Sequence, residues 1–137
     1  MAIRRVKIGV VGLGRMGKRH VRNLIYRTPR AEVVAVCTNE PHELEWARNN
    51  EEYKEFGIAT YEDYDEMLNH PDLQAVWVST STDVHAIQTL KGINKGIHVL
   101  CEKPLSTDLA EAQRVVDAAA QKPELKVMAA FSRRFDA

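Results

Sequence analysis

Three glycines, Gly12, Gly14 and Gly17, stand in Gly-x-Gly-x-x-Gly spacing directly after a short apolar run at 6–11. The β-branched residues of that run are typical of a strand in the middle of a parallel sheet. In this setting the first glycine permits a tight turn, the second lets a pyrophosphate approach the backbone, and the third lets the following helix pack closely. Backbone N–H groups at the start of that helix favour phosphate. The stretch therefore predicts a strand, a dinucleotide-binding loop and a helix at about 16–26; the alternative is an ordinary strand-to-helix turn.

The rest of the chain alternates apolar, strand-like runs with helical spacing of apolar residues. Further strands are predicted at 32–37, 58–61, 75–79, 97–101 and 126–131. Further helices are predicted at 41–50, 64–68, 84–95 and from about 109 to 120. The expected fold is α/β, a doubly wound parallel sheet (a Rossmann fold) of about six strands with helices on both faces.

Two local details of these helices are also predicted. Thr82 or Asp83 is expected to cap the helix at 84–95, as an alternative or in addition to lying at a ligand site, because their oxygens can accept from the first backbone N–H groups. The last helix carries apolar residues at helical spacing, and this stripe is expected to lie in the core. Its members are Leu109, Ala112, Val115, Val116 and Ala119.

Charge and cysteine content exclude several classes of function. The 137 residues carry 19 basic and 19 acidic side chains, so no overall positive field attracts nucleic acid or an anionic membrane. No apolar run approaches the ~20 residues that cross a bilayer, and no secretory segment opens the chain. We expect one cytoplasmic domain. Cys37 and Cys101 have no Cys or His at metal-ligand spacing, so buried free thiols are expected, with no disulfide or metal site.

The residue after the second strand decides which dinucleotide such a fold accepts. An acidic side chain at that position binds the ribose hydroxyls of NAD, but here Thr38 and Asn39 follow the strand. Both side chains can donate to the 2′-phosphate of NADP, and Arg15 in the glycine loop can add opposite charge. NADP is therefore slightly favoured over NAD. The alternative is that Glu40 reaches the ribose.

Polar residues follow the fourth strand, at the edge of a parallel sheet where ligands bind. Ser79, Thr80 and Ser81 are therefore expected to line the nicotinamide side of a pocket. His85, in the first turn of the next helix, is a candidate ligand contact. A histidine used only for packing is the alternative.

The fifth strand leads into Glu102, Lys103 and Pro104. The proline disfavours helical angles at Lys103, so the chain leaves the strand extended and can direct the ammonium group toward the pocket. A lysine in that place can hold a substrate hydroxyl or relay its proton. The alternative is a surface lysine paired with Glu102.

Four blocks together resemble a known family: 8–17 with the glycine triplet, 79–85, 96–105 (Gly-Ile-His-Val-Leu-Cys-Glu-Lys-Pro-Leu) and 130–136 (Ala-Phe-Ser-Arg-Arg-Phe-Asp). In order and spacing they are similar to the glucose-fructose oxidoreductase, inositol dehydrogenase and MocA-like family of NAD(P)-dependent oxidoreductases. The resemblance implies hydride transfer between nicotinamide and a sugar or polyol carbon, with Lys103 contacting the substrate hydroxyl. It also implies that Glu102 and Pro104 lie against the cofactor, with Ser132 and Arg133 at the junction with the substrate.

The chain departs from the family pattern in two positions and in length. Family members often have an acidic residue in place of Thr38 and usually have Pro in place of Ser81. Their second domain, an open mixed sheet, supplies the Asp and His that complete the catalytic set of the lysine. We therefore expect 1–137 to be the NAD(P)-binding domain without that second domain, binding cofactor with little turnover. The alternative is a stand-alone NAD(P)-binding or sensing module that acts through a protein partner, such as a second copy of the chain.

The residues expected at the cofactor come from the glycine loop, the strand ends and the last block, and no metal ligand is among them. In chain order they are Gly12, Leu13, Gly14, Arg15, Met16, Gly17, Thr38, Asn39, Ser79, Thr80, Ser81, His85, Glu102, Lys103, Pro104, Ser132 and Arg133.

Overall fold

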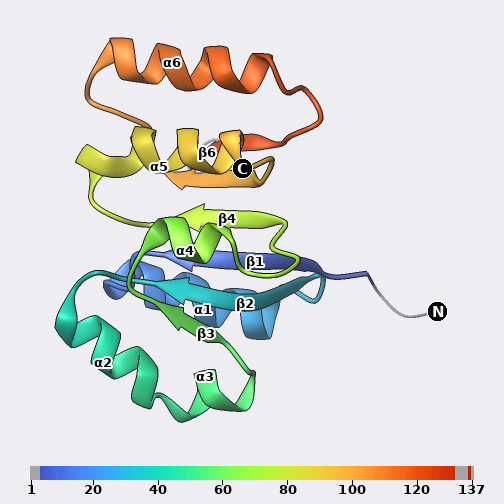
Figure 1. Cartoon of the computed structure of the whole chain (residues 1–137), viewed down its shortest axis with the longest axis vertical. Coiled ribbons are helices and arrows are strands. Elements are labelled where there is room, and N and C mark those ends of the chain that lie inside the picture. Colours follow the sequence, from blue (N-terminus) through green and yellow to red (C-terminus); the bar gives the residue numbers. More distant parts are fainter. Residues whose placement is uncertain (1–3, 132–135, 137) are drawn as a thin grey trace.

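Parallel strands form the centre of the molecule in a computed structural model that describes residues 4–131 and 136. The six strands make one sheet in the order β3-β2-β1-β4-β5-β6, and every neighbouring pair is parallel (Figure 1). They are β1 (Val6–Val11), β2 (Ala31–Cys37), β3 (Ala59–Tyr61), β4 (Ala75–Val78), β5 (His98–Glu102) and β6 (Val127–Ala130). The order reverses between β1 and β4, and such a reversal opens a crevice at the carboxyl ends of the strands.

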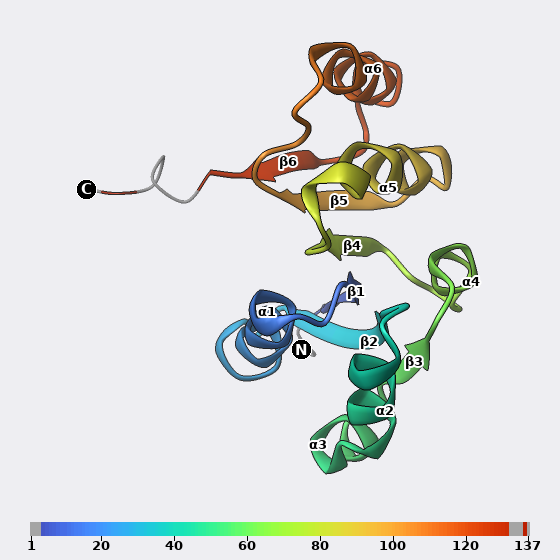
Figure 2. The ribbon, with the colours of Figure 1, turned by 90° about the vertical axis from the view of Figure 1, so that its left-hand side faces the viewer.

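Helices cover both faces of this sheet, so the doubly wound parallel fold predicted from the sequence is confirmed. They are α1 (Arg15–Arg27), α2 (Pro41–Asn49), α3 (Glu51–Glu55), α4 (Tyr64–Leu68), α5 (Thr82–Asn94) and α6 (Leu109–Ala120). Figure 2 shows α1 on one face, beside β1 and β2, and α4, α5 and α6 on the other. The helical segment at 51–55 is separate from α2 because the Asn50 side chain accepts from the Tyr53 N–H and starts a new helix.

Alternating strand residues fill two apolar clusters, one for each face. Val10 and Val36 pack with Val21 and Leu24 of α1, whereas the next residue of each strand joins the cluster beneath α4 and α5. This period of two is what a sheet buried on both faces requires. Cys37 and Cys101 lie in the second cluster as free thiols, as predicted.

Two local predictions are wrong. Helix α5 begins at Thr82 with Ser81 as its N-cap, so Thr82 and Asp83 lie inside the first turn and cap nothing. The stripe on α6 is only partly core: Val115 is 2% exposed, but Leu109 is 84% and Val116 is 54% exposed. Helix α6 lies at the outside of the molecule (Figure 2) and packs mainly on α5, so only part of the stripe is covered.

Within the described part of the chain, no helix combines the length and apolar character needed to span a membrane.

Candidate functional site

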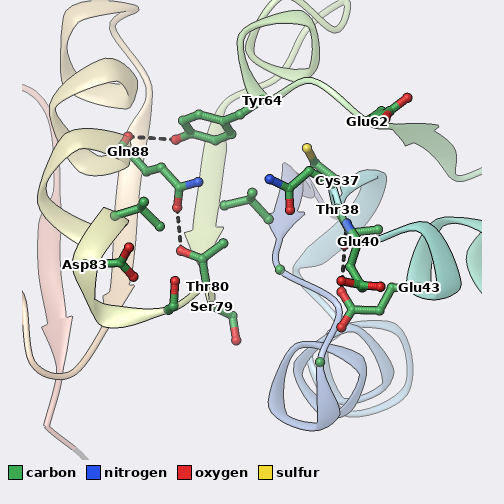
Figure 3. Close-up of a pocket in the computed structure, with 16 residues that line it drawn as sticks. Cys37, Thr38, Glu40, Glu43, Glu62, Tyr64, Ser79, Thr80, Asp83 and Gln88 are labelled. Atoms are coloured by element: carbon green, nitrogen blue, oxygen red, sulfur yellow. Dashed lines mark hydrogen bonds between the residues drawn. The ribbon is translucent and has the colours of Figure 1, made fainter.

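A pocket of about 660 Å³ lies where the strand order reverses, at the carboxyl ends of β1, β2 and β4 (Figure 3). Four carboxylates line it, and no lysine, arginine or histidine does so among the residues that the structure describes. The lining residues are Val11, Gly12, Gly14, Cys37, Thr38, Asn39, Glu40, Glu43, Glu62, Tyr64, Ser79, Thr80, Ser81, Asp83, Val84 and Gln88.

The three glycines of the loop have different surroundings. Gly12 has φ +94°, and a Cβ there would lie 2.4 Å from the Ser79 carbonyl oxygen, so only glycine fits the turn. A Cβ at Gly17 would lie 1.8 Å from the Gly12 carbonyl oxygen, because α1 packs directly on the loop. At Gly14 the nearest atom to such a Cβ is 3.9 Å away, the Oε2 of Glu43. The middle glycine therefore leaves its space open to the pocket, as the approach of a phosphate requires.

The N-terminus of α1 meets the pocket at this open position. Gly14 is the N-cap, offers no side-chain cap, and is followed by a first turn without acidic residues. The Lys18 N–H already bonds the Gly14 carbonyl at 3.0 Å, but the N–H groups before it have no partner within the helix. Amides at a helix N-terminus bind anions, and the helix dipole adds to the attraction.

The end of β2 carries a hydrogen-bonded group in place of a free hydroxyl. Thr38 is buried, its hydroxyl donates to Glu43 Oε1 at 2.6 Å, and its oxygen accepts from the Glu40 N–H at 3.2 Å (Figure 3). A threonine hydroxyl has one proton, and here that proton is given to a carboxylate. The slight preference for NADP assumed that Thr38 donates to a phosphate and that Arg15 assists. Arg15 is exposed and lies outside the pocket lining, so that preference is not supported.

The turn after β4 forms the opposite wall. Ser79, Thr80 and Ser81 all line the pocket, and Ser79 Oγ is buried without a partner in the described chain. The Thr80 hydroxyl donates to the side-chain oxygen of Gln88, whose backbone carbonyl accepts from Tyr64 at 2.8 Å (Figure 3). Burial raises the pKa of the Tyr64 phenol, so this side chain stays neutral and remains a donor.

His85 lies behind this wall. It is 2% exposed, and its two ring nitrogens face backbone carbonyls, Nδ1 at 2.7 Å from Pro104 and Nε2 at 2.9 Å from Thr80. Carbonyl oxygens only accept, so a ring nitrogen bonds its carbonyl when it carries the proton. His85 thus joins the pocket turn to the loop that carries Lys103.

The Glu-Lys-Pro loop is tied to α1 on its other side. Glu102 Oε1 lies 2.6 Å from His20 Nε2, and the His20 ring stacks on Trp77 with centroids 4.2 Å apart. The expected alternative partner of Glu102 was Lys103, but its partner in the described chain is His20. Lys103 and Pro104 are exposed and joined by a cis peptide bond, and neither lines the pocket.

Three remaining expectations concern residues elsewhere. The Leu13 side chain is fully buried in the cluster beneath α1, and Met16 is 47% exposed on the first turn of that helix. Ser132 and Arg133 lie outside the described residues.

Glu43 was not singled out from the sequence. It stands five residues after Thr38 and comes back to it only because α2 starts at Pro41 and places Glu43 in its first turn. Gln88 was not singled out from the sequence either, and about two turns of α5 bring its side chain to the Thr80 hydroxyl. The sequence signal that could have identified Glu43 is its position, as an acidic residue in the first turn of the helix that follows the second strand.

The sheet order, the position of the pocket and the open glycine at a helix N-terminus define a dinucleotide-binding domain of the Rossmann class. The chain belongs to the GFO_IDH_MocA family, the oxidoreductase family with an NAD-binding Rossmann fold, whose model matches residues 6–131. It is an NAD(P)-binding domain like that of the inositol dehydrogenases.

Individual relatives are similar over this domain only. The chain is 32% identical over 133 residues to inositol 2-dehydrogenase of Salmonella typhimurium, covering 96% of this chain and 38% of that protein. It superposes on scyllo-inositol dehydrogenase from Lactobacillus casei with bound NAD(H) and scyllo-inositol, with a TM-score of 0.87 and 36% sequence identity. The match covers 97% of this chain and 38% of that protein. For a 3-ketoreductase from Actinomadura kijaniata in complex with TDP-benzene and NADP, the TM-score is 0.78 and the sequence identity 28%. The match covers 93% of this chain and 38% of that protein. The chain thus spans 38% of the length of these proteins, and both cofactors occur among them.

Proposed function

We propose that this chain binds NAD and serves as the cofactor domain of a dehydrogenase acting on a hydroxyl group of an inositol or a related polyol. The observation that carries the proposal is the open space at Gly14, at the N-terminus of α1 and inside the pocket. The similarity to inositol dehydrogenases supports the substrate class.

The pocket offers a separate place to each part of the dinucleotide. The pyrophosphate fits the backbone of 12–14 and the first amides of α1. The adenosine ribose then falls at the end of β2, and the nicotinamide at the turn formed by Ser79, Thr80 and Ser81. The unpartnered Ser79 Oγ supplies a polar contact on that side. Nicotinamide, when bound, accepts or gives the hydride.

The charge of the pocket favours NAD over NADP. A 2′-phosphate carries close to two negative charges at neutral pH, and the end of β2 presents Glu40 and Glu43 with no cation among the described lining residues. The amides and dipole at the N-terminus of α1 offset the charge of the pyrophosphate, but a 2′-phosphate at the end of β2 would meet carboxylates without a counter-charge, and this opposes binding. The ribose hydroxyls of NAD instead donate to carboxylates.

Lys103 is proposed to hold the substrate hydroxyl. Its loop leaves β5 at the edge of the sheet that carries the pocket, and His85 bonds both this loop and the Thr80 turn. Hydride transfer from an alcohol also needs a group that takes the hydroxyl proton. Neither lysine nor histidine lines the described pocket to take this proton, so we expect residues 1–137 to bind cofactor with little turnover of polyols.

A fluorescence titration of the chain with NADH tests the proposal, with Gly14→Val as the matched variant. The Cβ of the valine would have 3.9 Å to the nearest atom, so the substitution brings no clash at that position, and circular dichroism checks that the variant is folded. Saturable binding that weakens at least about 30-fold in Gly14→Val is expected, because the side chain occupies the phosphate cradle. Absence of binding to the folded wild-type chain, or equal binding by the variant, contradicts the proposal.

A further inference from the structure

The end of β2 lacks the acidic residue that discriminates NAD from NADP in this class of fold, yet a carboxylate reaches the same place from another element. The Thr38 hydroxyl donates a hydrogen bond to Glu43 Oε1 at 2.6 Å, and the oxygen of the same hydroxyl accepts one from the Glu40 N–H at 3.2 Å. This chain of two bonds fixes the direction of the Glu43 side chain. Thr38 is 4% exposed, so the arrangement is sheltered from water.

The second oxygen of the same carboxylate faces the glycine loop. Glu43 Oε2 is the nearest atom to the open position at Gly14, 3.9 Å from where a Cβ would stand. No hydrogen bond to this oxygen is formed within the described residues, so its lone pairs are available to a ligand. Glu43 also lies in the first turn of α2, where the helix dipole stabilises a negative charge.

The other three carboxylates of the pocket are less suited to this task. Glu40, Glu62 and Asp83 are all exposed, whereas Glu43 is half-buried. None of the three has its side chain held by a hydrogen bond comparable to that between Thr38 and Glu43 in the described structure. A fixed, partly desolvated carboxylate discriminates between ligands more strongly than a mobile one in water.

We propose that Glu43 is the specificity-determining residue for the cofactor: its free oxygen accepts from the adenosine ribose hydroxyls of NAD and its charge excludes the 2′-phosphate of NADP. Thr38 is a positioning residue that holds this carboxylate. The inference rests on the proposed function, since it assigns a role within the same dinucleotide pocket. It also explains how a threonine can follow β2 in a chain that binds NAD.

Parallel titrations with NADH and NADPH test the assignment in wild type, Glu43→Gln, Thr38→Val and the control Glu45→Gln. The wild type is expected to prefer NADH by about 100-fold or more, the range that an unpaired like charge in a binding site produces. Glu43→Gln keeps the bond from Thr38 but removes the charge, so its preference should fall about 10-fold or more, through tighter NADPH and weaker NADH binding. Glu45→Gln removes an exposed charge from the same helix but outside the pocket lining, and should leave the preference within about 3-fold of wild type.

Thr38→Val separates position from charge. The valine matches threonine in shape but cannot hold Glu43, so NADH affinity should fall by about 5-fold while Thr38→Ser restores it. Circular dichroism and thermal unfolding confirm that each variant is folded. Normal NADH binding with an unchanged preference in Glu43→Gln overturns the assignment and leaves the proposed function standing. Failure of the folded wild-type chain to bind either nucleotide overturns both.

Discussion

Replacing Gly17 by alanine tests whether the contact between α1 and the glycine loop is as close as the structure shows. The new Cβ would lie 1.8 Å from the Gly12 carbonyl oxygen and 2.8 Å from its carbonyl carbon. Both atoms belong to the backbone, so no side chain can rotate away. The loop and the helix would have to separate by about 1 Å in an interior that is packed as densely as a crystal.

That separation has a cost that can be worked out. Overpacking of a filled site costs about 1–3 kcal/mol. Movement of the loop also weakens the bond from the Gly12 N–H to the Cys37 carbonyl, now 2.8 Å, which contributes about 1 kcal/mol. Alanine in a helix gains back about 1 kcal/mol relative to glycine. The last two contributions cancel, so the free energy of unfolding of Gly17→Ala should fall by about 1–3 kcal/mol.

Gly14→Ala is the matched control. Its backbone has φ −68° and ψ −170°, extended angles that alanine adopts freely, and the nearest atom to the new Cβ is 3.9 Å away. Its free energy of unfolding should stay within about 0.5 kcal/mol of wild type. Urea denaturation followed by tryptophan fluorescence measures both values. Equal stability of Gly17→Ala and wild type, or an equal loss in the two variants, would refute the account of the loop.

Three further predictions concern residues around the pocket and on α6. His85→Ala removes a buried side chain whose two ring nitrogens face the Pro104 and Thr80 carbonyls, so urea denaturation should show a loss of about 2–4 kcal/mol in the free energy of unfolding. His85→Gln should recover part of that loss. Burial raises the pKa of the Cys37 thiol from 9.0 to about 12, so the thiol loses its proton at lower pH in the unfolded chain, and the free energy of unfolding should fall as the pH rises from 9 toward 12. Cys37→Ala should show a flatter pH dependence, and an identical slope would count against burial of this thiol as the cause. Val116 is 54% exposed and Val115 is 2% exposed, so Val116→Ser should change the free energy of unfolding by less than about 0.5 kcal/mol, whereas Val115→Ala should lower it by about 1–3 kcal/mol. Equal effects of the two substitutions would contradict the packing of α6.

The sheet could be predicted from the sequence because its strands and helices differ in hydrophobic period. The glycine triplet also predicted the nature of the loop, since Gly12, Gly14 and Gly17 each have the surroundings that their spacing implies. Burial on α6 was overestimated, because periodicity shows which side chains share a face and not whether a neighbouring layer covers that face. Leu109 belongs to the stripe but is exposed at the start of α6.

Contacts that depend on tertiary structure were not visible. The sequence presents Thr38 as a free donor, but the start of α2 brings Glu43 to its hydroxyl and changes the charge of the site. Glu102 and Lys103 are adjacent in the chain, yet the carboxylate lies 2.6 Å from His20 Nε2 on α1. In both cases the residue type indicated the right region of the fold, and the partner was decided by which elements pack there.

Mapping of backbone amide shifts by NMR on addition of NAD tests the central claim most directly. The account predicts saturable shifts concentrated at the N–H groups of Gly14, Arg15 and Met16 in the glycine loop, with further shifts at the end of β2 and in the turn at Ser79. Binding of NAD with no change at the glycine loop, or shifts confined to another part of the surface, would contradict the assignment of this pocket as the dinucleotide site.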